Sequence, residues 1–363
     1  MSKRFVFAGG GTGGHIFPLV AVAQAVRAAS PDVEIVYVGT ERGMEKRVLG
    51  DLGEKLELLH ILPIKGGGVT GAIKGAARAL MSLPDSRNLL RRLEPAAVLS
   101  IGGYAAGPVS LAARSMRIPL ALLEPNSVVG LANKLVAPFA QRAYVAFPET
   151  EKLFRRKIVR LTGVPLRRGF KPIACEPQDG LLRILVIGGS QGAITLNHNV
   201  PAAIGMARRQ GKVRIQVKHQ SGRDREKEVI DRYEQAGARD EVEVVPFIDD
   251  VPAALGQADV VVQRAGASAV SEVCAVGRAS VLIPYPYAAG DHQLHNARAM
   301  EAAGASVCVA SQEATPERLA AILQELAADL PRCKRMAEVA RGRGRPDAAD
   351  AIAKDFLSLA GVA

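Results

Sequence analysis

Residues 3–29 read KRFVFAGGGTGGHIFPLVAVAQAVRAA, and residues 182–207 read LRILVIGGSQGAITLNHNVPAAIGMA. Each stretch begins with apolar residues typical of a buried strand, passes through a glycine-rich loop, and continues with apolar residues at helical spacing. The same strand–loop–helix unit therefore occurs once in each half of the chain. This repetition predicts two Rossmann-like halves.

Further apolar segments around these two units are predicted to be strands. They are Glu34–Val38, Ala97–Ile101, Leu120–Leu123, Ala143–Phe147, Ile215–His219, Val242–Pro246, Val260–Gln263 and Ser280–Pro284. Strands that alternate with helical segments are typical of parallel sheets wound by right-handed crossovers. We therefore expect an α/β fold with two domains, over residues 1–163 and 164–343, and a last helix near 344–363 that packs back on the first domain.

The composition is that of a globular protein, with 48% hydrophobic and 23% charged residues in a chain of 363. A chain of this length exceeds what one core usually supports, which also favours two domains. The four cysteines are scattered and form no C-x-x-C pair, so we expect a reducing, cytosolic setting. We expect no signal peptide. We also expect no membrane span, because the sequence has no apolar run of the roughly 18 residues that a span needs.

The charge is unevenly distributed along the chain. Residues 1–165 carry 22 Lys and Arg against 12 Asp and Glu, whereas residues 166–363 carry 25 against 24. A basic half predicts contact with an anionic surface, either nucleic acid or phospholipid, although a generally basic proteome would give the same count. The chain has no tryptophan and few other aromatics to stack on bases, which argues against nucleic acid.

The first glycine loop allows two interpretations. Gly9, Gly11 and Gly14 match the dinucleotide fingerprint G-x-G-x-x-G, but the acidic residue expected after the next strand is displaced to Glu41. His15 follows the last glycine. It either makes a local hydrogen bond at a helix N-terminus or acts as an imidazole that orients or deprotonates a hydroxyl.

Polar residues also follow other predicted strands. Gly102 and Gly103 form a second glycine turn after the strand at 97–101, and Glu124 is either a helix cap or an acid in the ligand cleft. In the second half, the loop at Ser190 can bind nucleotide phosphates, and Glu272 can accept both hydroxyls of a ribose. No Asp-x-Asp triplet is present, and His292 with His295 is a weak metal pattern, so no protein-held metal is predicted.

Taken together, GGGTGGHIFP, GGYAAGP, EPNSVVGLANK, GVPLR, GGSQG, FIDD, RAGASAVSE and DHQ occur in an order that resembles the MurG family of GT-B glycosyltransferases. The resemblance spans nearly the whole chain. It implies two Rossmann-like domains facing a cleft, and inverting transfer of N-acetylglucosamine from UDP-GlcNAc to the 4-hydroxyl of lipid I, which yields lipid II. It also implies direct displacement with a general base, for which His15 is the first candidate and Glu124 the second.

The resemblance also implies where the substrates bind. The donor residues would be Thr12, Gly13, Gly14, Asn126, Arg167, Ser190, Ile248, Ala267, Ser268, Ala269, Val270, Ser271, Glu272 and Gln293. The acceptor pyrophosphate would meet Gly11, Gly102, Gly103 and Tyr104. The chain departs from the usual motifs at Leu123, Pro125 and Val164, and at Ala269, where many similar proteins have threonine.

Lipid I lies in a membrane, so the resemblance implies a peripheral protein on the cytoplasmic face. In the stretch at 65–84, Val69, Ile73 and Leu80 share a helical face beside Lys74 and Arg78, a pattern of an interfacial helix on anionic phospholipid. The same pattern would suit a helix packed on its own sheet. Cell-wall or division proteins are possible further partners.

Three rival functions remain open at this point. They are another GT-B enzyme that uses UDP-sugars, such as an epimerase or a natural-product glycosyltransferase, a nicotinamide-dependent oxidoreductase, and a nucleotide-sugar-binding module without turnover.

Overall fold

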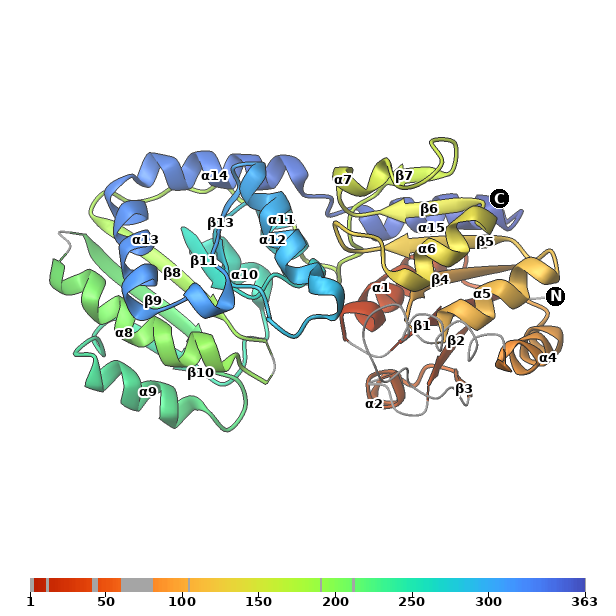
Figure 1. Cartoon of the computed structure of the whole chain (residues 1–363), viewed down its shortest axis with the longest axis horizontal. Helices are drawn as coiled ribbons and strands as arrows, with labels where there is room; N and C mark the ends of the chain where they lie inside the picture. The colour runs from red at the N-terminus through yellow and green to blue at the C-terminus, as the bar shows by residue number, and fades with distance from the viewer. Residues whose placement is uncertain are drawn as a thin grey trace. The chain divides into compact units, whose positions relative to one another are not determined.

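The computed structural model describes residues 3–10, 13–40, 45–59, 81–103, 105–189, 191–210 and 213–362, without the side chains at 13, 45 and 47. The chain divides into two compact units (Figure 1). Unit 1 comprises Met1–Arg168 and Asp347–Ala363, and unit 2 comprises Gly169–Pro346. Each unit contains one parallel sheet with helices on its two faces, which confirms the predicted α/β class.

The sheet of unit 1 has the strand order β3-β2-β1-β4-β5-β6-β7, and every pair is parallel. Its strands are β1 (Arg4–Gly9), β2 (Glu34–Thr40), β3 (Leu56–Leu59), β4 (Ala97–Gly102), β5 (Leu120–Glu124), β6 (Arg142–Val145) and β7 (Val159–Leu161). The order reverses direction between β1 and β4. In open α/β sheets this switch point is where ligands bind.

Helices cover both faces of this sheet. They are α1 (Gly13–Ala29), α2 (Glu45–Asp51), α4 (Leu83–Leu93), α5 (Ala106–Ser115), α6 (Leu131–Val136), the 3-10 turn η1 (Ala137–Phe139), α7 (Pro148–Glu151) and α15 (Ala348–Leu359). Helices α1 and α15 share a buried cluster with Phe5, Phe7 and Tyr37 of the sheet. Helices α4, α5 and α6 cover the alternate residues of the same strands, such as Val6 and Val98.

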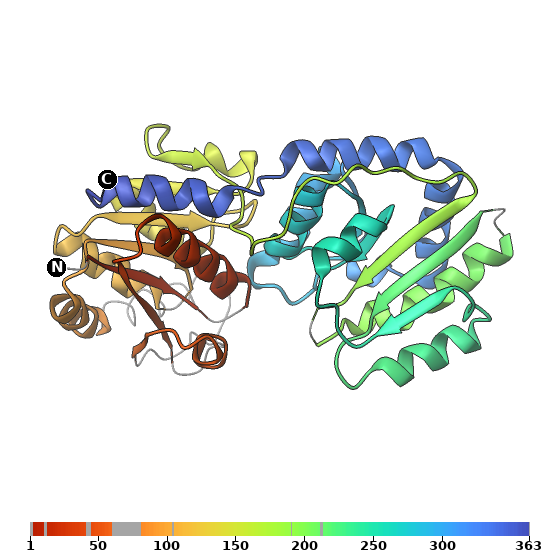
Figure 2. The same ribbon diagram turned by 180° about the vertical axis from the view of Figure 1, so that it is seen from behind.

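Helix α15 returns from the end of unit 2 and lies beside α1 (Figure 2). The ring of Phe356 is fully buried, with its centroid 5.3 Å from that of Phe5 and 5.8 Å from that of Phe7. At the same helix, the Asp355 carboxylate accepts hydrogen bonds from Arg142 at 2.8 Å and from the Tyr144 hydroxyl at 2.9 Å. The last helix is therefore part of the core of unit 1.

Unit 2 repeats this architecture with the strand order β10-β9-β8-β11-β12-β13. Its strands are β8 (Leu181–Ile187), β9 (Arg214–Gln220), β10 (Val242–Val245), β11 (Val260–Gln263), β12 (Ala279–Leu282) and β13 (Ser306–Cys308). Its main helices are α8 (Ile194–Gln210), α9 (Glu226–Gln235), α10 (Val251–Gln257), α11 (Ala267–Val276), α12 (His292–Ala302), α13 (Pro316–Ala328) and α14 (Leu330–Arg343). One face of the sheet packs against α8, α9 and α13 in a single buried cluster.

Three of the predicted strands end earlier than expected. Pro246 and Pro284 lie outside β10 and β12, since proline has no N–H to donate to a neighbouring strand. Phe147 lies outside β6, because it is the residue that precedes α7. The short strands β3, β7 and β13 were not predicted.

We expect Phe356→Ala to lower the free energy of unfolding by about 3–5 kcal/mol, because it removes a buried ring that touches two others. Denaturant unfolding measures this change. Lys354→Ala, at an exposed position of the same helix, is the control and should stay within about 0.5 kcal/mol. Equal midpoints for the two variants would contradict the structural role of α15.

Candidate active site

The candidate site residues of unit 1 lie where three neighbouring strands end. Strands β1, β4 and β5 are adjacent and parallel, so their carboxyl ends share one edge of the sheet. The segments that leave this edge contain Gly14 and His15 after β1, Gly102 and Gly103 at β4, and Glu124 with Asn126 at β5. The structure therefore brings together candidates that are far apart in the sequence.

His15 lies in the first turn of α1 and is partly exposed. Its Nδ1 is 3.1 Å from the carbonyl oxygen of Gly10. A carbonyl only accepts hydrogen bonds, so Nδ1 carries the hydrogen, and in the neutral ring the lone pair is on Nε2. The local hydrogen bond and the function of a base were alternatives in the sequence, but one imidazole can serve both.

The loop at Gly103 touches the loop that holds His15. Gly103 has φ +89°, and a Cβ built on it would lie 2.7 Å from the same Gly10 carbonyl oxygen. Only glycine allows both this backbone conformation and this close approach. The second glycine turn thus fixes the position of the carbonyl group that orients His15.

Glu124 is 2% exposed and fully occupied by donors. Its Oε1 accepts from the backbone and side-chain nitrogens of Asn126, at 3.1 and 3.2 Å. Its Oε2 accepts from Gly130 N at 2.9 Å and from Asn133 Nδ2 at 3.0 Å. Burial raises the pKa of this carboxyl, and the four donated hydrogen bonds oppose that rise.

Of the two roles considered for Glu124, the geometry favours the structural one. Gly130 is the residue before α6, so the carboxylate binds the backbone at the start of that helix. It also holds Asn126, the candidate sugar contact, by two hydrogen bonds. A carboxylate with four donors around its two oxygens is suited to ordering the loop that follows β5.

In unit 2, helix α11 begins directly after β11 and carries six donor candidates, Ala267 to Glu272. Gly266 precedes it in an extended conformation and provides no side-chain cap, so the first backbone N–H groups of the helix can bind an anion. The Oγ of Ser268 is buried and has no hydrogen-bond partner among the described residues. Ala269 accepts a hydrogen bond from Gln263 through its backbone oxygen, at 3.0 Å.

Gln293 joins two loops at this edge of unit 2. Its Oε1 accepts from Ala265 N at 3.2 Å and from Tyr285 N at 2.9 Å. The side-chain oxygen is therefore committed to the backbone, and the amide nitrogen is the group that Gln293 can offer to a ligand. Ile248 follows β10 and is only 5% exposed. A contact between this residue and the uracil of a nucleotide would therefore be made by its backbone.

The remaining predicted site residues do not belong to the groups described above. Arg167 is exposed and belongs to unit 1, next to the boundary of the units. Nine candidates lie outside the described residues, namely Gly11, Thr12, Val69, Ile73, Lys74, Arg78, Leu80, Tyr104 and Ser190.

Sequence reasoning gave no role to Arg264, the first residue after β11. Its guanidinium donates to Thr195 Oγ1 and to the carbonyl oxygens of Ile283 and Pro284, each at 3.2 Å. Burial lowers the pKa of Arg264, because it disfavours the charged form. The sequence signal that could have identified Arg264 is its position at the carboxyl end of a buried strand. The guanidinium is a cation close to the start of α11.

The part of the chain that the structure describes contains no group of three or more His, Cys, Asp and Glu side chains that could hold a metal ion. Nor, within the same ranges, is any helix both long and apolar enough to cross a membrane.

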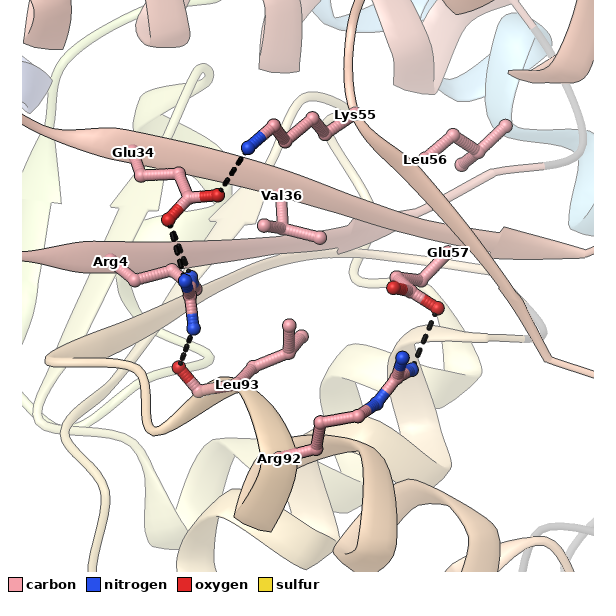
Figure 3. A pocket seen from close by; sticks show the side chains of 8 residues that line it. All are labelled: Arg4, Glu34, Val36, Lys55, Leu56, Glu57, Arg92 and Leu93. Atoms are coloured by element: carbon pink, nitrogen blue, oxygen red, sulfur yellow. Dashed lines mark hydrogen bonds and ion pairs between the residues drawn. The ribbon is translucent and has the colours of Figure 1, made fainter.

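A cavity of about 460 Å³ lies at the opposite edge of the unit 1 sheet (Figure 3). Arg4 and Glu34 are the first residues of β1 and β2, and they form an ion pair at 2.7 Å. Lys55 binds Glu34 at 2.7 Å, and Arg92 binds Glu57 at 2.9 Å. Each of these charged side chains is engaged in an ion pair far from the strand ends that carry the candidate residues, so the cavity is no part of the site.

Comparison with known proteins identifies the class. Residues 5–145 match the family model of the glycosyltransferase family 28 N-terminal domain, and residues 183–352 match that of its C-terminal domain. With two parallel sheets and glycine-rich turns at their carboxyl edges, the chain is a glycosyltransferase of the GT-B architecture.

The chain is 55% identical over 357 residues to a UDP-N-acetylglucosamine–N-acetylmuramyl-(pentapeptide) pyrophosphoryl-undecaprenol N-acetylglucosamine transferase of Sorangium cellulosum, covering 98% of this chain and 88% of that protein. A protein of the same name from Syntrophotalea carbinolica is 40% identical, with 99% of both chains covered. The crystal structure of Acinetobacter baumannii MurG superposes with a TM-score of 0.82 at 30% identity, over 98% of this chain and 99% of that one. The chain belongs to this family, the MurG transferases.

We expect Gly103→Ala to lower kcat, because a Cβ would displace the Gly10 carbonyl that orients His15. The strained backbone should also cost about 1–3 kcal/mol of stability. Gly107→Ala, whose Cβ would meet nothing within 4 Å, is the matched control. Steady-state kinetics of both variants measure the effect, and equal kcat values would contradict it.

Proposed function

We propose that this protein transfers N-acetylglucosamine from UDP-GlcNAc to the 4-hydroxyl of lipid I, forming lipid II and UDP. The observation that carries the proposal is the 55% identity, over nearly the whole chain, to a relative named for this transfer. In the proposed step, the hydroxyl oxygen attacks the anomeric carbon while the bond to UDP breaks on the opposite side. The configuration inverts, and no covalent intermediate is needed.

His15 accepts the proton of the acceptor hydroxyl in this proposal. The support is its geometry: Nδ1 donates to Gly10, so Nε2 carries the lone pair that a base needs. Glu124 is assigned the positioning of Asn126, a contact of the sugar, instead of a proton transfer. Gly11, Gly102, Gly103 and Tyr104 would bind the acceptor pyrophosphate.

Unit 2 binds the donor in this proposal. The N-terminus of α11 and the loop at Ser190 would hold the diphosphate, with Glu272 on the ribose and the backbone of Ile248 on the uracil. The amide nitrogen of Gln293 would donate to the sugar. Arg167, a residue of unit 1, keeps its proposed contact with the nucleotide. We add Arg264, because its half-buried charge lies at the same edge and favours an anion there.

We also propose that unit 1 docks on the anionic cytoplasmic leaflet, where lipid I would be reached, through the basic apolar stretch at 65–84. The described residues support an interfacial surface on this unit. Leu131, Leu135 and Phe139 recur every four residues along α6 and η1, and they are 52%, 55% and 40% exposed. Lys134 is exposed among them. Apolar residues beside a cation are typical of a membrane-surface segment.

The transfer is tested with radiolabelled UDP-GlcNAc and a short-chain lipid I analogue, following UDP and the lipid product. We expect His15→Ala to lower kcat by roughly 10²–10⁴-fold, the usual contribution of a general base. Turnover near that of the parent at saturating acceptor would remove His15 from the mechanism. Free N-acetylmannosamine or an epimerised donor without a lipid product would indicate an epimerase, and tight NADH binding an oxidoreductase.

Membrane docking is tested by co-sedimentation with vesicles of anionic or zwitterionic phospholipid. We expect Ile73→Glu combined with Lys74→Glu to abolish most of the binding to anionic vesicles, because each lysine contributes about 1 kcal/mol there. Lys152→Glu with Leu153→Glu likewise replaces one lysine and one aliphatic residue, at exposed positions of unit 1, and should retain binding. Unchanged sedimentation of the first variant would refute the proposed surface.

A further inference from the structure

Three polar side chains form a continuous hydrogen-bonded chain inside unit 2. The Tyr233 hydroxyl is 3.0 Å from His219 Nδ1, and His219 Nε2 is 3.2 Å from Asn197 Oδ1. Asn197 Nδ2 then donates to the carbonyl oxygen of Ser221 at 2.8 Å. All four residues are completely buried, although they come from α9, β9, α8 and the turn after β9.

The direction of each hydrogen bond in this chain is determined. Because Asn197 donates through Nδ2 to a carbonyl, its Oδ1 is the acceptor, so His219 Nε2 carries a hydrogen. Burial lowers the pKa of His219 to about 3, and the ring is therefore neutral at ordinary pH. Nδ1 must then accept from the Tyr233 hydroxyl. Every polar atom in the series has a partner of the right kind.

The series of hydrogen bonds ends at the Ser221 carbonyl. This carbonyl is in contact with the glycine loop after β8. Gly192 has φ +72°, and a Cβ there would overlap the Ser221 oxygen. On the next residue, a Cβ at Gly222 would overlap Gly192 N. The backbone of the turn at 221–222 is thus the surface against which Gln191 and Gly192, in the loop after β8, rest. That loop precedes α8, the helix that carries Asn197.

We propose that Tyr233, His219 and Asn197 are positioning residues that set the position of Gly192, in the segment between β8 and α8, and thereby the affinity for the donor diphosphate. The inference rests on the proposed function, in which this loop binds the phosphates. None of the three side chains touches the substrate. They act through the Ser221 carbonyl, which lies between them and the loop.

A buried polar chain could instead serve only the stability of the unit 2 core, so the test must separate the two roles. The main variant is Asn197→Leu, which keeps the size of the side chain and removes both of its hydrogen bonds. The matched control is Asn199→Leu, on the same helix. Asn199 also donates to a backbone carbonyl, that of Ala314 at 2.7 Å, but at a site next to α13.

The measurement is the dissociation constant of UDP and of uridine for each full-length protein, by calorimetry. Uridine has no phosphate, so it reports on the rest of the nucleotide site. We expect Asn197→Leu to weaken UDP binding about tenfold, the scale of the lost hydrogen bond to the Ser221 carbonyl, while uridine binding and the Asn199→Leu control keep the parent's values. A ratio of UDP to uridine affinity that stays at the parent's value would overturn the proposal.

A second pair of variants decides the matter if Asn197→Leu does not fold. His219→Gln places an amide nitrogen near the position of Nε2 and can still donate to Asn197, whereas the shorter His219→Asn can satisfy only Tyr233. We expect His219→Gln to retain the UDP-to-uridine ratio and His219→Asn to lose it, with a matching rise in KM for UDP-GlcNAc. Equal ratios for the two would overturn the proposal.

The two proposals fail in different ways. If the parent protein binds neither UDP nor UDP-GlcNAc, the proposed function fails. If the parent binds both and the variants keep the parent's ratio, only the role of the buried chain fails.

Discussion

The sites in both units depend on one geometric constraint: the backbone must turn from a buried parallel strand into a helix with almost no room. At Gly10 and Gly103 of unit 1, two such turns approach so closely that a single added carbon would lie 2.7 Å from a carbonyl oxygen. At Gly192 and Gly222 of unit 2, an added carbon would overlap backbone atoms. Because glycine has no side chain, the N–H groups at the start of the following helix stay accessible to anions. Glycine also leaves no side chain to orient the neighbouring groups.

Orientation is therefore supplied by polar side chains next to these turns, a buried one in unit 1 and a partly exposed one in unit 2. In unit 1 the carboxylate of Glu124 accepts from three donors of the loop after β5 and from Asn133 of α6. In unit 2 the oxygen of Gln293 gathers two backbone N–H groups from the loops after β11 and β12. The two side chains act in the same way, because an oxygen acceptor with several lone pairs can hold the backbone of several segments in place at once. A buried acceptor left without these donors would destabilise the fold.

The sequence was sufficient for the architecture and the family, because both depend on patterns that are local or ordered along the chain. The two strand–glycine–helix units predicted two parallel sheets, and the ordered motifs predicted the MurG family, which the 55% identical relative confirms. The strands β7 and β13 were missed because each has only three residues, too few for a periodic pattern, and β3 because its sequence LELL contains no β-branched residue. Contacts across the sheet were also out of reach. The contact between Gly103 and the Gly10 carbonyl joins two distant parts of the chain and cannot be inferred from spacing, whereas a local hydrogen bond for His15 and a helix cap for Glu124 were among the sequence-based alternatives.

Three of the positions that the sequence led us to expect as departures from the usual family motifs lie in different surroundings. Leu123 precedes Glu124 in β5, and alternation along a strand sends neighbouring side chains to opposite faces. The structure places Leu123, fully buried, in the same cluster as Tyr144 and Phe356, beneath α15. Val164 is 1% exposed in the same unit. Apolar residues at these two positions are therefore matched to the packing of unit 1, whereas Ala269 lies in the first turn of α11, among the donor candidates. Of these three positions, Ala269 is the one that lies among the donor candidates instead of in the core of a unit.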